Sequence, residues 1–362
     1  MGIESLARPE IVAMKPYSSA RKEAPGIGIL LNANEAPQVH VADPQWRKLS
    51  LHRYPQPQPA LLRSKLAELY AVSEDQLLIT RGSDEGIDLL TRVFCRAGQD
   101  AVVECTPCFG MYRIAATIQG ARVIDVPRRA ENGFRVDFEK LEQAITGQAG
   151  VRLVFLTSPN NPTGDLISQD RLESVLRAAE GRALVVLDEA YIEFSSENSA
   201  SELVGRWPHL VVLRTLSKAW AAAGIRCGVV IANPAVIGLL LRVIAPYPLS
   251  AITIDAALRA IAADSRVRQQ EFVESVRRRR AGFYRFISEL DWVMEAWQGE
   301  ANFILVRVAD AAGLVSWCAA HGIRIRDFST QNQLDGCVRM TIGSPGEMDN
   351  LKSALLAYGE QR

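Results

Sequence analysis

The chain has 362 residues, of which 48% are hydrophobic and 23% charged, and its 41 basic residues balance 41 acidic ones. A formal net charge of zero excludes a general electrostatic attraction to nucleic acid or anionic membranes, and the length exceeds what one hydrophobic core usually supports. These numbers favour an enzyme of about two domains that acts on small molecules.

No apolar stretch reaches the ~18 residues that a membrane span requires. The start of the chain, residues 1–10, lacks the basic and apolar segments of a secretory signal. We therefore expect a cytoplasmic protein, in which the six cysteines are small buried hydrophobic residues.

The first part of the chain predicts an N-terminal arm, at residues 1–28, followed by a large α/β domain at 29–234. In that domain, apolar runs that predict strands alternate with stretches whose apolar residues recur at helical spacing. Strands are expected at 77–80, 101–104, 151–156, 183–187, 210–213 and 228–232, and helices at 61–70, 83–97 and 169–179. This alternation is typical of a mostly parallel, doubly wound sheet.

Residues 235–362 are predicted to form a smaller α+β domain. Its expected helices are a segment that starts at 235 and ends before Pro246, followed by 266–290, 312–321 and 346–358, and its strands are 303–308 and 339–342. The four consecutive arginines at 277–280 have glutamates nearby, so we expect a solvated helix face there and no nucleic-acid site.

The pair Cys105 and Cys108 has two alternatives to simple packing. Zinc would need a second pair of ligands, and the four histidines stand apart from one another. A thioredoxin-like redox site remains as an alternative, although such motifs open a helix within a small βαβ domain. We interpret the pair as packing residues and expect no metal site.

Polar motifs follow three of the predicted strands, at the point where each strand ends. Asn161, Asp188 and Lys218 each follow one of them. Because open α/β sheets bind ligands at the carboxyl ends of their strands, these residues are expected to converge on one crevice. A partly desolvated lysine amine loses proton affinity and can form a Schiff base with an aldehyde. The pattern therefore predicts a site for pyridoxal phosphate.

Groups around this lysine are suited to hold a phosphate. Thr215 and Ser217 offer hydroxyls, and Arg226 offers a planar fork of donors. A glycine precedes the helix that is expected to start at Ser83, and the amides of Ser83 and Asp84 are expected to bind the phosphate. Arg226 would balance the negative charge of Asp84.

These motifs and their order resemble those of the fold-type I aminotransferases, which use pyridoxal phosphate. Within this family the chain is most similar to the histidinol-phosphate aminotransferases, and the match spans nearly the whole chain. Any one motif is weak, but chance does not explain all of them in the family's order. The matching stretches are 31–35, 53–55, 81–86, 161–164, 188–191, 217–218, Arg226, 245–250, 301–303, 326–327 and 339–343.

The resemblance implies how the cofactor is held and used. Lys218 would bind it and then carry the proton, Asp188 would stabilise its protonated ring nitrogen, and Tyr191 would hydrogen-bond its phenolic oxygen. Tyr54 would reach the cofactor phosphate of a partner in a homodimer. The implied cofactor-binding residues are Lys218, Asp188, Asn161, Tyr191, Ser83, Asp84, Phe109, Thr215, Ser217, Arg226 and Tyr54, with the ring of Phe109 stacked on the cofactor.

The same resemblance implies that Tyr17, Asn34, Tyr247, Arg326 and Arg339 bind the substrate. Arg339 matches an arginine that holds the phosphate in the histidinol-phosphate branch and an α-carboxylate in other aminotransferases. Because a guanidinium binds either anion, the motif does not separate phosphate from carboxylate substrates.

Three functional hypotheses follow. The leading one is transamination of L-histidinol phosphate with 2-oxoglutarate, which gives imidazole-acetol phosphate and glutamate in histidine biosynthesis. An alternative keeps the cofactor and acts on aromatic amino acids, or decarboxylates threonine phosphate. A third is a sensor domain of a transcription regulator, which would need a DNA-binding module that the short N-terminal arm cannot hold.

Overall fold

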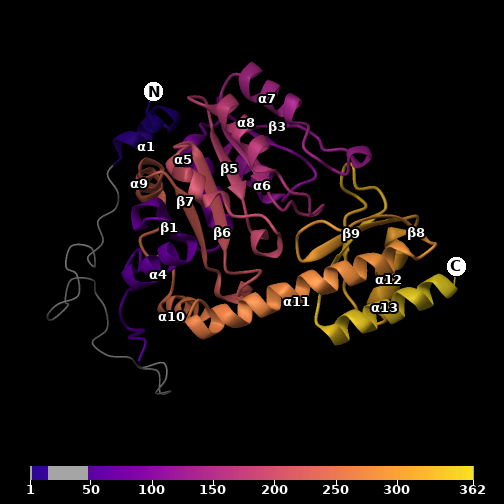
Figure 1. The fold of residues 1–362 in the computed structure, drawn as a ribbon. Helices are drawn as coiled ribbons and strands as arrows, with labels where there is room; N and C mark the ends of the chain where they lie inside the picture. Colours follow the sequence, from indigo (N-terminus) through magenta and orange to yellow (C-terminus); the bar gives the residue numbers. More distant parts are fainter. Residues whose placement is uncertain (1, 15–47, 362) are drawn as a thin grey trace.

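A computed structural model describes residues 2–14 and 48–361 of the chain. Tyr17, Asn34 and the stretch 31–35 lie outside the described residues. Figure 1 shows two sheets with helices packed against them and one long helix that extends from the first sheet to the second. None of the described helices is long and apolar enough to cross a membrane.

Seven strands within the described residues form a mixed sheet in the order β1-β7-β6-β5-β4-β2-β3. Neighbouring strands from β3 to β6 run parallel, whereas β7 pairs antiparallel with both β6 and β1. The prediction of a mostly parallel, doubly wound sheet is confirmed. The strands are β1 (Leu77–Thr80), β2 (Ala101–Glu104), β3 (Arg122–Asp125), β4 (Val151–Thr157), β5 (Leu184–Asp188), β6 (Leu210–Thr215) and β7 (Gly228–Ala232).

The reversed direction of β7 follows from the short connection before it. A parallel neighbour requires a crossover, usually an α-helix, that returns the chain to the opposite edge of the sheet. Residues 216–227 are all described, and they form a turn and the 3₁₀ helix η6 (Ala223–Ile225) without an α-helix. The chain therefore turns back directly, and this turn carries Lys218.

Strands β1, β2 and β4 to β7 are largely buried on both faces because helices cover each side of the sheet (Figure 1). Successive residues of β5 alternate between two core clusters, with Val185 in one and Val186 in the other. The first cluster includes side chains of α4 (Ala60–Tyr70), α7 (Phe138–Gly147), α8 (Gln169–Ala179) and α10 (Ala251–Ala260). The second includes side chains of α5 (Ser83–Phe94), α6 (Met111–Gln119) and α9 (Pro234–Val243), and α1 (Pro9–Ala13) packs against it.

A second, antiparallel sheet has the order β10-β11-β9-β8. Its strands are β8 (Val293–Trp297), β9 (Phe303–Val308), β10 (Arg326–Asp327) and β11 (Cys337–Thr341), and its helices are α11 (Ala263–Ser288), α12 (Ala311–Ala320) and α13 (Pro345–Glu360). Side chains of β9, β11, α11, α12 and α13 share one buried cluster, and partly buried side chains of β8 pack against it. The expected domain boundary at residue 234 stays a prediction, and α9 and α10 beyond it pack on the first sheet.

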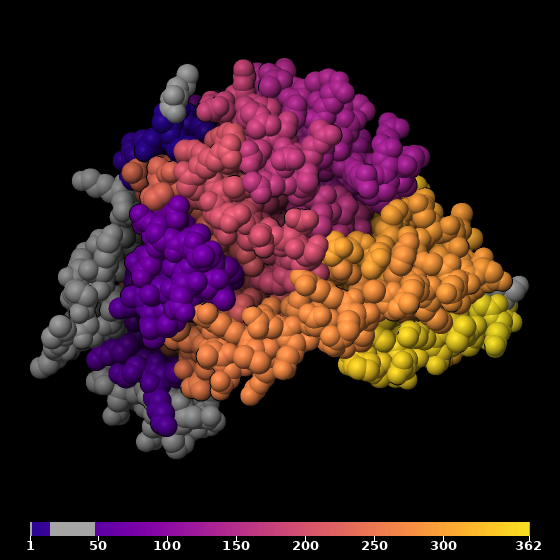
Figure 2. All heavy atoms as spheres, in the orientation of Figure 1, coloured from indigo at the N-terminus to yellow at the C-terminus, as the bar shows by residue number. Residues whose placement is uncertain are grey.

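The two sheets meet where two glycines come into backbone contact. A Cβ on Gly164 would lie 2.8 Å from the Cα of Gly299, and the amide of Glu300 donates to the carbonyl of Gly164 at 2.7 Å. Arg280 of α11 holds Glu300 through an ion pair of 2.6 Å. Figure 2 shows the orange C-terminal part of the chain in contact with the magenta part that contains the first sheet. The loop that carries Asn161 is thereby joined to the second sheet.

Candidate active site

The carboxyl ends of β4, β5 and β6 lie side by side. Thr157, the last residue of β4, pairs with Asp188, the last residue of β5, and Asp188 pairs with Leu213 of β6. A cavity of about 150 Å³ lies at this edge. The predicted site residues that line it are Ser83, Asp84, Phe109, Asn161, Asp188, Tyr191, Thr215, Ser217, Lys218 and Arg226.

Lys218 lies in an environment that disfavours its charged form. Burial lowers the pKa of its amine, and the nearby cations Arg339 and Arg226 lower it further. The Nζ atom lies 5.7 Å from the centre of the Tyr191 ring. At neutral pH a larger share of this amine is therefore unprotonated than for an exposed lysine, which suits a nucleophile and a proton carrier.

Asp188 is 3% exposed and accepts two hydrogen bonds. The hydroxyl of Tyr112 donates to Oδ2 at 2.9 Å, and the amide of Ala190 donates to Oδ1 at 3.0 Å. Burial raises the pKa of this carboxyl to about 6, because these hydrogen bonds offset only part of the desolvation. A cation beside the carboxylate would remove this cost, and a protonated pyridine nitrogen is such a cation.

Tyr112 and Thr157 were missed by the sequence analysis. The Tyr112 hydroxyl, fully buried on α6, lies 2.8 Å from Thr157 Oγ1 and also donates to Asp188. The available signals were that Thr157 closes the same apolar run that precedes Asn161, and that Tyr112 follows Phe109 by three residues. Tyr112 orients the buried carboxylate, and Thr157 contacts the Tyr112 hydroxyl.

Gly82 forms the centre of a cradle at the start of α5. Its φ is +77°, and a Cβ there would lie 2.7 Å from Arg226 Nη2. Arg226 Nη1 donates to Ser217 Oγ at 3.3 Å, and Nη2 lies 3.0 Å from Asp84 Oδ2. Helix-start amides, a hydroxyl and a guanidinium form a donor set that binds phosphate, so these residues fit the phosphate of the expected cofactor.

A larger cavity, of about 790 Å³, adjoins the first, and Phe109 and Asn161 line both. Arg326 and Arg339 line it, and they lie opposite each other in the pairing of β10 with β11. Arg339 donates to Asn161 Oδ1, and both guanidinium groups lie against the ring of Phe328, at 5.9 and 5.2 Å from its centre. Burial lowers the pKa of Arg339, and Arg326 lowers it further. Two cations held this close favour an anion beside them.

Tyr54 and Tyr247 lie elsewhere in this chain. Their rings stack on each other with centres 4.5 Å apart and an interplanar angle of 13°. Tyr54 is 51% exposed, and neither ring is among the described residues that line the Lys218 cavity. No local sequence pattern indicates this stacking, because the two tyrosines lie far apart along the chain.

Cys105 and Cys108 are free thiols. Burial raises the pKa of Cys105 to about 12 and that of Cys108 well above its ordinary value. A redox dithiol needs a lowered thiol pKa, so their environment favours packing over the redox alternative. Within 2–14 and 48–361, no group of three or more His, Cys, Asp or Glu side chains is arranged to hold a metal ion.

The turn that carries Lys218 and the buried Asp188 lie at the carboxyl edge of a mostly parallel sheet. Together with the motifs, this arrangement places the chain in the fold-type I class of pyridoxal-phosphate enzymes. The model of the family described as aminotransferase class I and II matches residues 27–355. The chain therefore belongs to this family, and it is a pyridoxal-phosphate-dependent aminotransferase.

Individual relatives point in the same direction. The histidinol-phosphate aminotransferase of Aeromonas hydrophila is 42% identical over 355 residues, which cover 98% of each chain. The solved structure of histidinol-phosphate aminotransferase from Sinorhizobium meliloti in complex with pyridoxal-5'-phosphate has a TM-score of 0.79 and 25% identity, over 88% of this chain and 85% of that one. L-threonine-O-3-phosphate decarboxylase from Porphyromonas gingivalis has a TM-score of 0.71 at 23% identity, over 86% and 91% of the chains, and shows the fold alone.

Because the cradle is centred on Gly82, we predict that Gly82→Ala raises the Kd for pyridoxal phosphate about tenfold or more. The new methyl group would meet Arg226 Nη2 at 2.7 Å, and the residue would also adopt a positive φ, which costs about 1–3 kcal/mol outside glycine. Fluorescence titration of the cofactor-free protein with pyridoxal phosphate measures the change.

Gly98→Ala is the matched control for this measurement. Gly98 also has a positive φ, of +70°, but a Cβ there meets nothing within 4 Å. The control should lose stability without losing cofactor affinity. Equal affinities of the Gly82 variant and the wild type would show that the cradle does not hold the cofactor.

The raised pKa of Asp188 predicts that the stability of the cofactor-free protein depends on pH. Its pKa rises from 3.8 to about 6 on folding, so the native state keeps this proton at pH values where the unfolded chain has lost it. The contribution of Asp188 to the free energy of unfolding therefore falls as pH rises from about 4 to about 6. Urea unfolding at pH 4 and pH 7 should show the wild type losing about 2–3 kcal/mol relative to Asp188→Asn. A difference that does not vary with pH would contradict the assignment.

Proposed function

We propose that this aminotransferase moves the amino group of L-histidinol phosphate to 2-oxoglutarate, yielding imidazole-acetol phosphate and L-glutamate in histidine biosynthesis. The observation that carries the proposal is the pair Arg326 and Arg339 in the cavity that adjoins the Lys218 cavity. A phosphate bound at this pair would lie in the cavity next to the one that Lys218 lines, so the amine of the same substrate could extend toward the lysine. The name of the 42% identical Aeromonas relative supports the same substrate.

Residues of the first sheet would carry the proton movements. Bound pyridoxal phosphate supplies an electron sink and carries the amino group between the two substrates. Lys218 Nζ would accept and return the proton, and its lowered pKa increases the neutral fraction that does so. The Asp188 carboxylate would hold a proton on the ring nitrogen, and Tyr191 and Asn161 would hydrogen-bond the phenolic oxygen.

The remaining cofactor contacts would fix its position. Ser217, Arg226 and the amides of Ser83 and Asp84 would bind the phosphate, with the Thr215 hydroxyl 2.9 Å from Ser217 Oγ. Phe109 would cover one face of the ring. These roles rest on the lining of one cavity by all these residues.

A half-reaction tests the substrate. The cofactor-loaded protein is mixed in separate experiments with L-histidinol phosphate, phenylalanine and threonine phosphate, and its visible absorbance is followed. Rapid loss of the absorbance with L-histidinol phosphate alone is expected, and Lys218→Ala should abolish it. Loss with phenylalanine alone, or release of carbon dioxide from threonine phosphate, would contradict the proposed substrate and leave the cofactor assignment intact.

The arginine pair provides a second measurement in the same assay. Arg339→Lys keeps the charge but loses the two-pronged contact with phosphate, so KM for L-histidinol phosphate should rise about tenfold or more. Arg324→Lys changes an exposed arginine that does not line this cavity and should leave KM unchanged. Equal KM values for the two variants would exclude Arg339 from phosphate binding.

We also propose that the protein acts as a homodimer with shared active sites. Tyr54 is half exposed and lies outside the lining of the Lys218 cavity of its own chain, so a second copy would be needed to bring it to a cofactor phosphate. Tyr247 stacks on Tyr54 and would be brought to the same place.

Complementation between two impaired variants tests the shared site. Homodimers of Lys218→Ala should be inactive and those of Tyr54→Ala weakly active. Each mixed dimer contains one intact site of two and should recover up to about half of the activity of a wild-type dimer. Light scattering confirms the dimer. Activity of the mixture equal to the average of the two homodimers would contradict a shared site.

A cytoplasmic location is part of the same proposal. Five of the six cysteines, Cys95, Cys105, Cys227, Cys318 and Cys337, are buried free thiols in the described chain, as a reducing compartment permits. Fractionation of the host with an activity assay tests the location, and recovery of the protein outside the cytoplasmic fraction would contradict it.

A further inference from the structure

The turn that carries Lys218 lies between the end of β6 and η6. Within the turn, the amide of Ala221 donates to the carbonyl of Lys218 at 3.1 Å, and the amide of Ala222 donates to the carbonyl of Leu216 at 3.1 Å. Ala221 has a φ of +51°, in the left-handed region. A turn with so little regular structure depends on its surroundings for its position, and so does the lysine at its centre.

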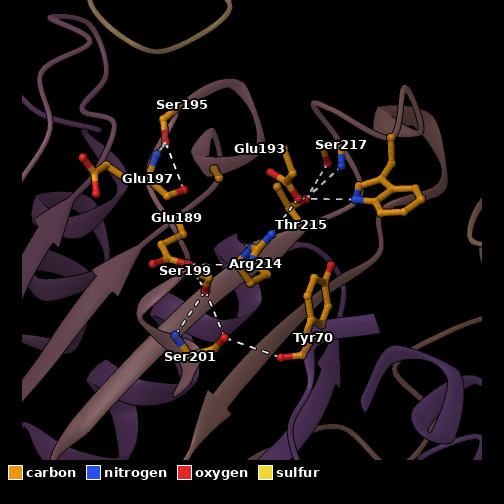
Figure 3. A network of polar contacts seen from close by, with 12 residues as sticks. Tyr70, Glu189, Glu193, Ser195, Glu197, Ser199, Ser201, Arg214, Thr215 and Ser217 are labelled. Atoms are coloured by element: carbon orange, nitrogen blue, oxygen red, sulfur yellow. Dashed lines mark hydrogen bonds and ion pairs between the residues drawn. The ribbon is translucent and has the colours of Figure 1, made fainter. Parts of the chain in front are cut away.

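One carboxylate oxygen contacts both sides of this turn. Glu193 Oε1 accepts a hydrogen bond from Arg214 Nη2 at 2.8 Å and another from the indole Nε1 of Trp220 at 3.3 Å. Arg214 precedes Lys218 by four residues, and Trp220 follows it by two. Figure 3 shows Glu193 and Arg214 directed toward each other within a larger polar network. Glu193 therefore bridges the two ends of the turn.

Glu193 is itself held in place by α11. It belongs to η4 (Ile192–Phe194), whose main-chain carbonyls accept hydrogen bonds from two arginines. Arg277 donates to the carbonyl of Glu193 at 3.1 Å and to that of Phe194 at 3.2 Å, and Arg280 donates to the carbonyl of Phe194 at 3.2 Å. The bridge thus starts from a fixed main chain, two residues after Tyr191.

We propose that Glu193 is a positioning residue for Lys218, which fixes the amine relative to Asp188 and Tyr191 by holding Arg214 and Trp220 with one oxygen. The inference rests on the proposed role of Lys218 in the reaction. The side chains of Glu193 and Arg214 are 13% and 8% exposed, and charge-assisted hydrogen bonds in such an environment are strong and directional. A shift of the turn would move the Lys218 amine relative to Asp188 and Tyr191 and away from the atoms between which it is proposed to carry a proton.

The network supplies Arg214 with partners that do not depend on Glu193. Its Nη1 lies 3.5 Å from Glu189 Oε2, and its guanidinium lies 4.7 Å from the centre of the Tyr70 ring (Figure 3). Glu189 is satisfied in turn by the hydroxyl of Ser199 and the amide of Ala200. The charge of Arg214 therefore remains compensated in a Glu193 variant, and the variant should fold.

Trp220→Phe tests the proposal with a small change. It removes the indole donor, keeps an aromatic ring, and should lower kcat about threefold to tenfold with little effect on KM. The visible circular dichroism of the cofactor-loaded protein should also change, because it reports the orientation of the bound cofactor and needs no substrate. This second readout separates failure of the inference from failure of the proposed substrate.

Glu193→Gln completes the experiment as a double-mutant cycle. It keeps an acceptor oxygen without the charge and should lower kcat further than Trp220→Phe. Because both changes act through the same oxygen, their effects on kcat should be less than additive when combined. Additive effects would overturn the proposal, since they would mean that Trp220 and Glu193 act separately.

Two other tryptophans provide matched controls. In the described chain the indole nitrogen of Trp207 is buried without a hydrogen-bond partner, so Trp207→Phe should leave kcat and the circular dichroism unchanged. The indole of Trp317 donates to the carbonyl of Ala354 at 2.8 Å, so Trp317→Phe should lower the Tm and leave kcat unchanged. If Trp220→Phe behaves like Trp317→Phe, with a lower Tm and wild-type kcat and dichroism, the bond is structural and the proposal is wrong.

Discussion

The parallel pairing of β4, β5 and β6 is the constraint on which the active site depends. Parallel hydrogen bonding brings the carboxyl ends of adjacent strands to one edge of the sheet, and the register places Thr157, Asp188 and Leu213 side by side there. Loops that leave these strands then deliver Asn161, Tyr191 and Lys218 to a common space. The antiparallel β7 adds a further consequence, because the chain must reverse at this edge and the reversal itself carries the lysine.

Two ionisable groups of the site, Asp188 and Lys218, are buried or half-buried, so that their charged forms are destabilised when no ligand is bound. Burial raises the pKa of Asp188, and burial with two nearby arginines lowers the pKa of Lys218. Each group would be relieved by the cofactor, the carboxylate by a cationic ring nitrogen and the amine by covalent attachment. The buried Arg214 is different, because two carboxylates outweigh the effect of burial and raise its pKa. Arg214 thus keeps its charge, whereas the pKa values of Asp188 and Lys218 are shifted in the directions that their proposed roles require.

The sequence predicted the strands that are almost uniformly buried and missed partly exposed strands at the edges of the sheets. Strands β4 to β7 are apolar runs and were found, whereas the edge strands β3 and β8 are partly exposed and show no such run; α6, α7 and α10 were missed as well. Site residues carried by short motifs were predicted, because neighbours in sequence share one loop. Contacts such as that of Tyr112 with Asp188, or of Arg339 with Asn161, join residues 76 and 178 positions apart, and no local pattern encodes them.

The order of the two cavities along the chain has an evolutionary consequence. The described residues that line the Lys218 cavity lie between Ser83 and Arg226, whereas two of the arginines that line the adjoining cavity, Arg326 and Arg339, follow later in the chain. Recombination can therefore change these two arginines without changing the residues that line the Lys218 cavity. One genetic exchange downstream of β7 would replace the two arginines that we propose bind the anion and keep the residues that we propose move the proton. Relatives with different substrates could diverge by such exchanges, provided that the backbone contact between Gly164 and Gly299 is preserved.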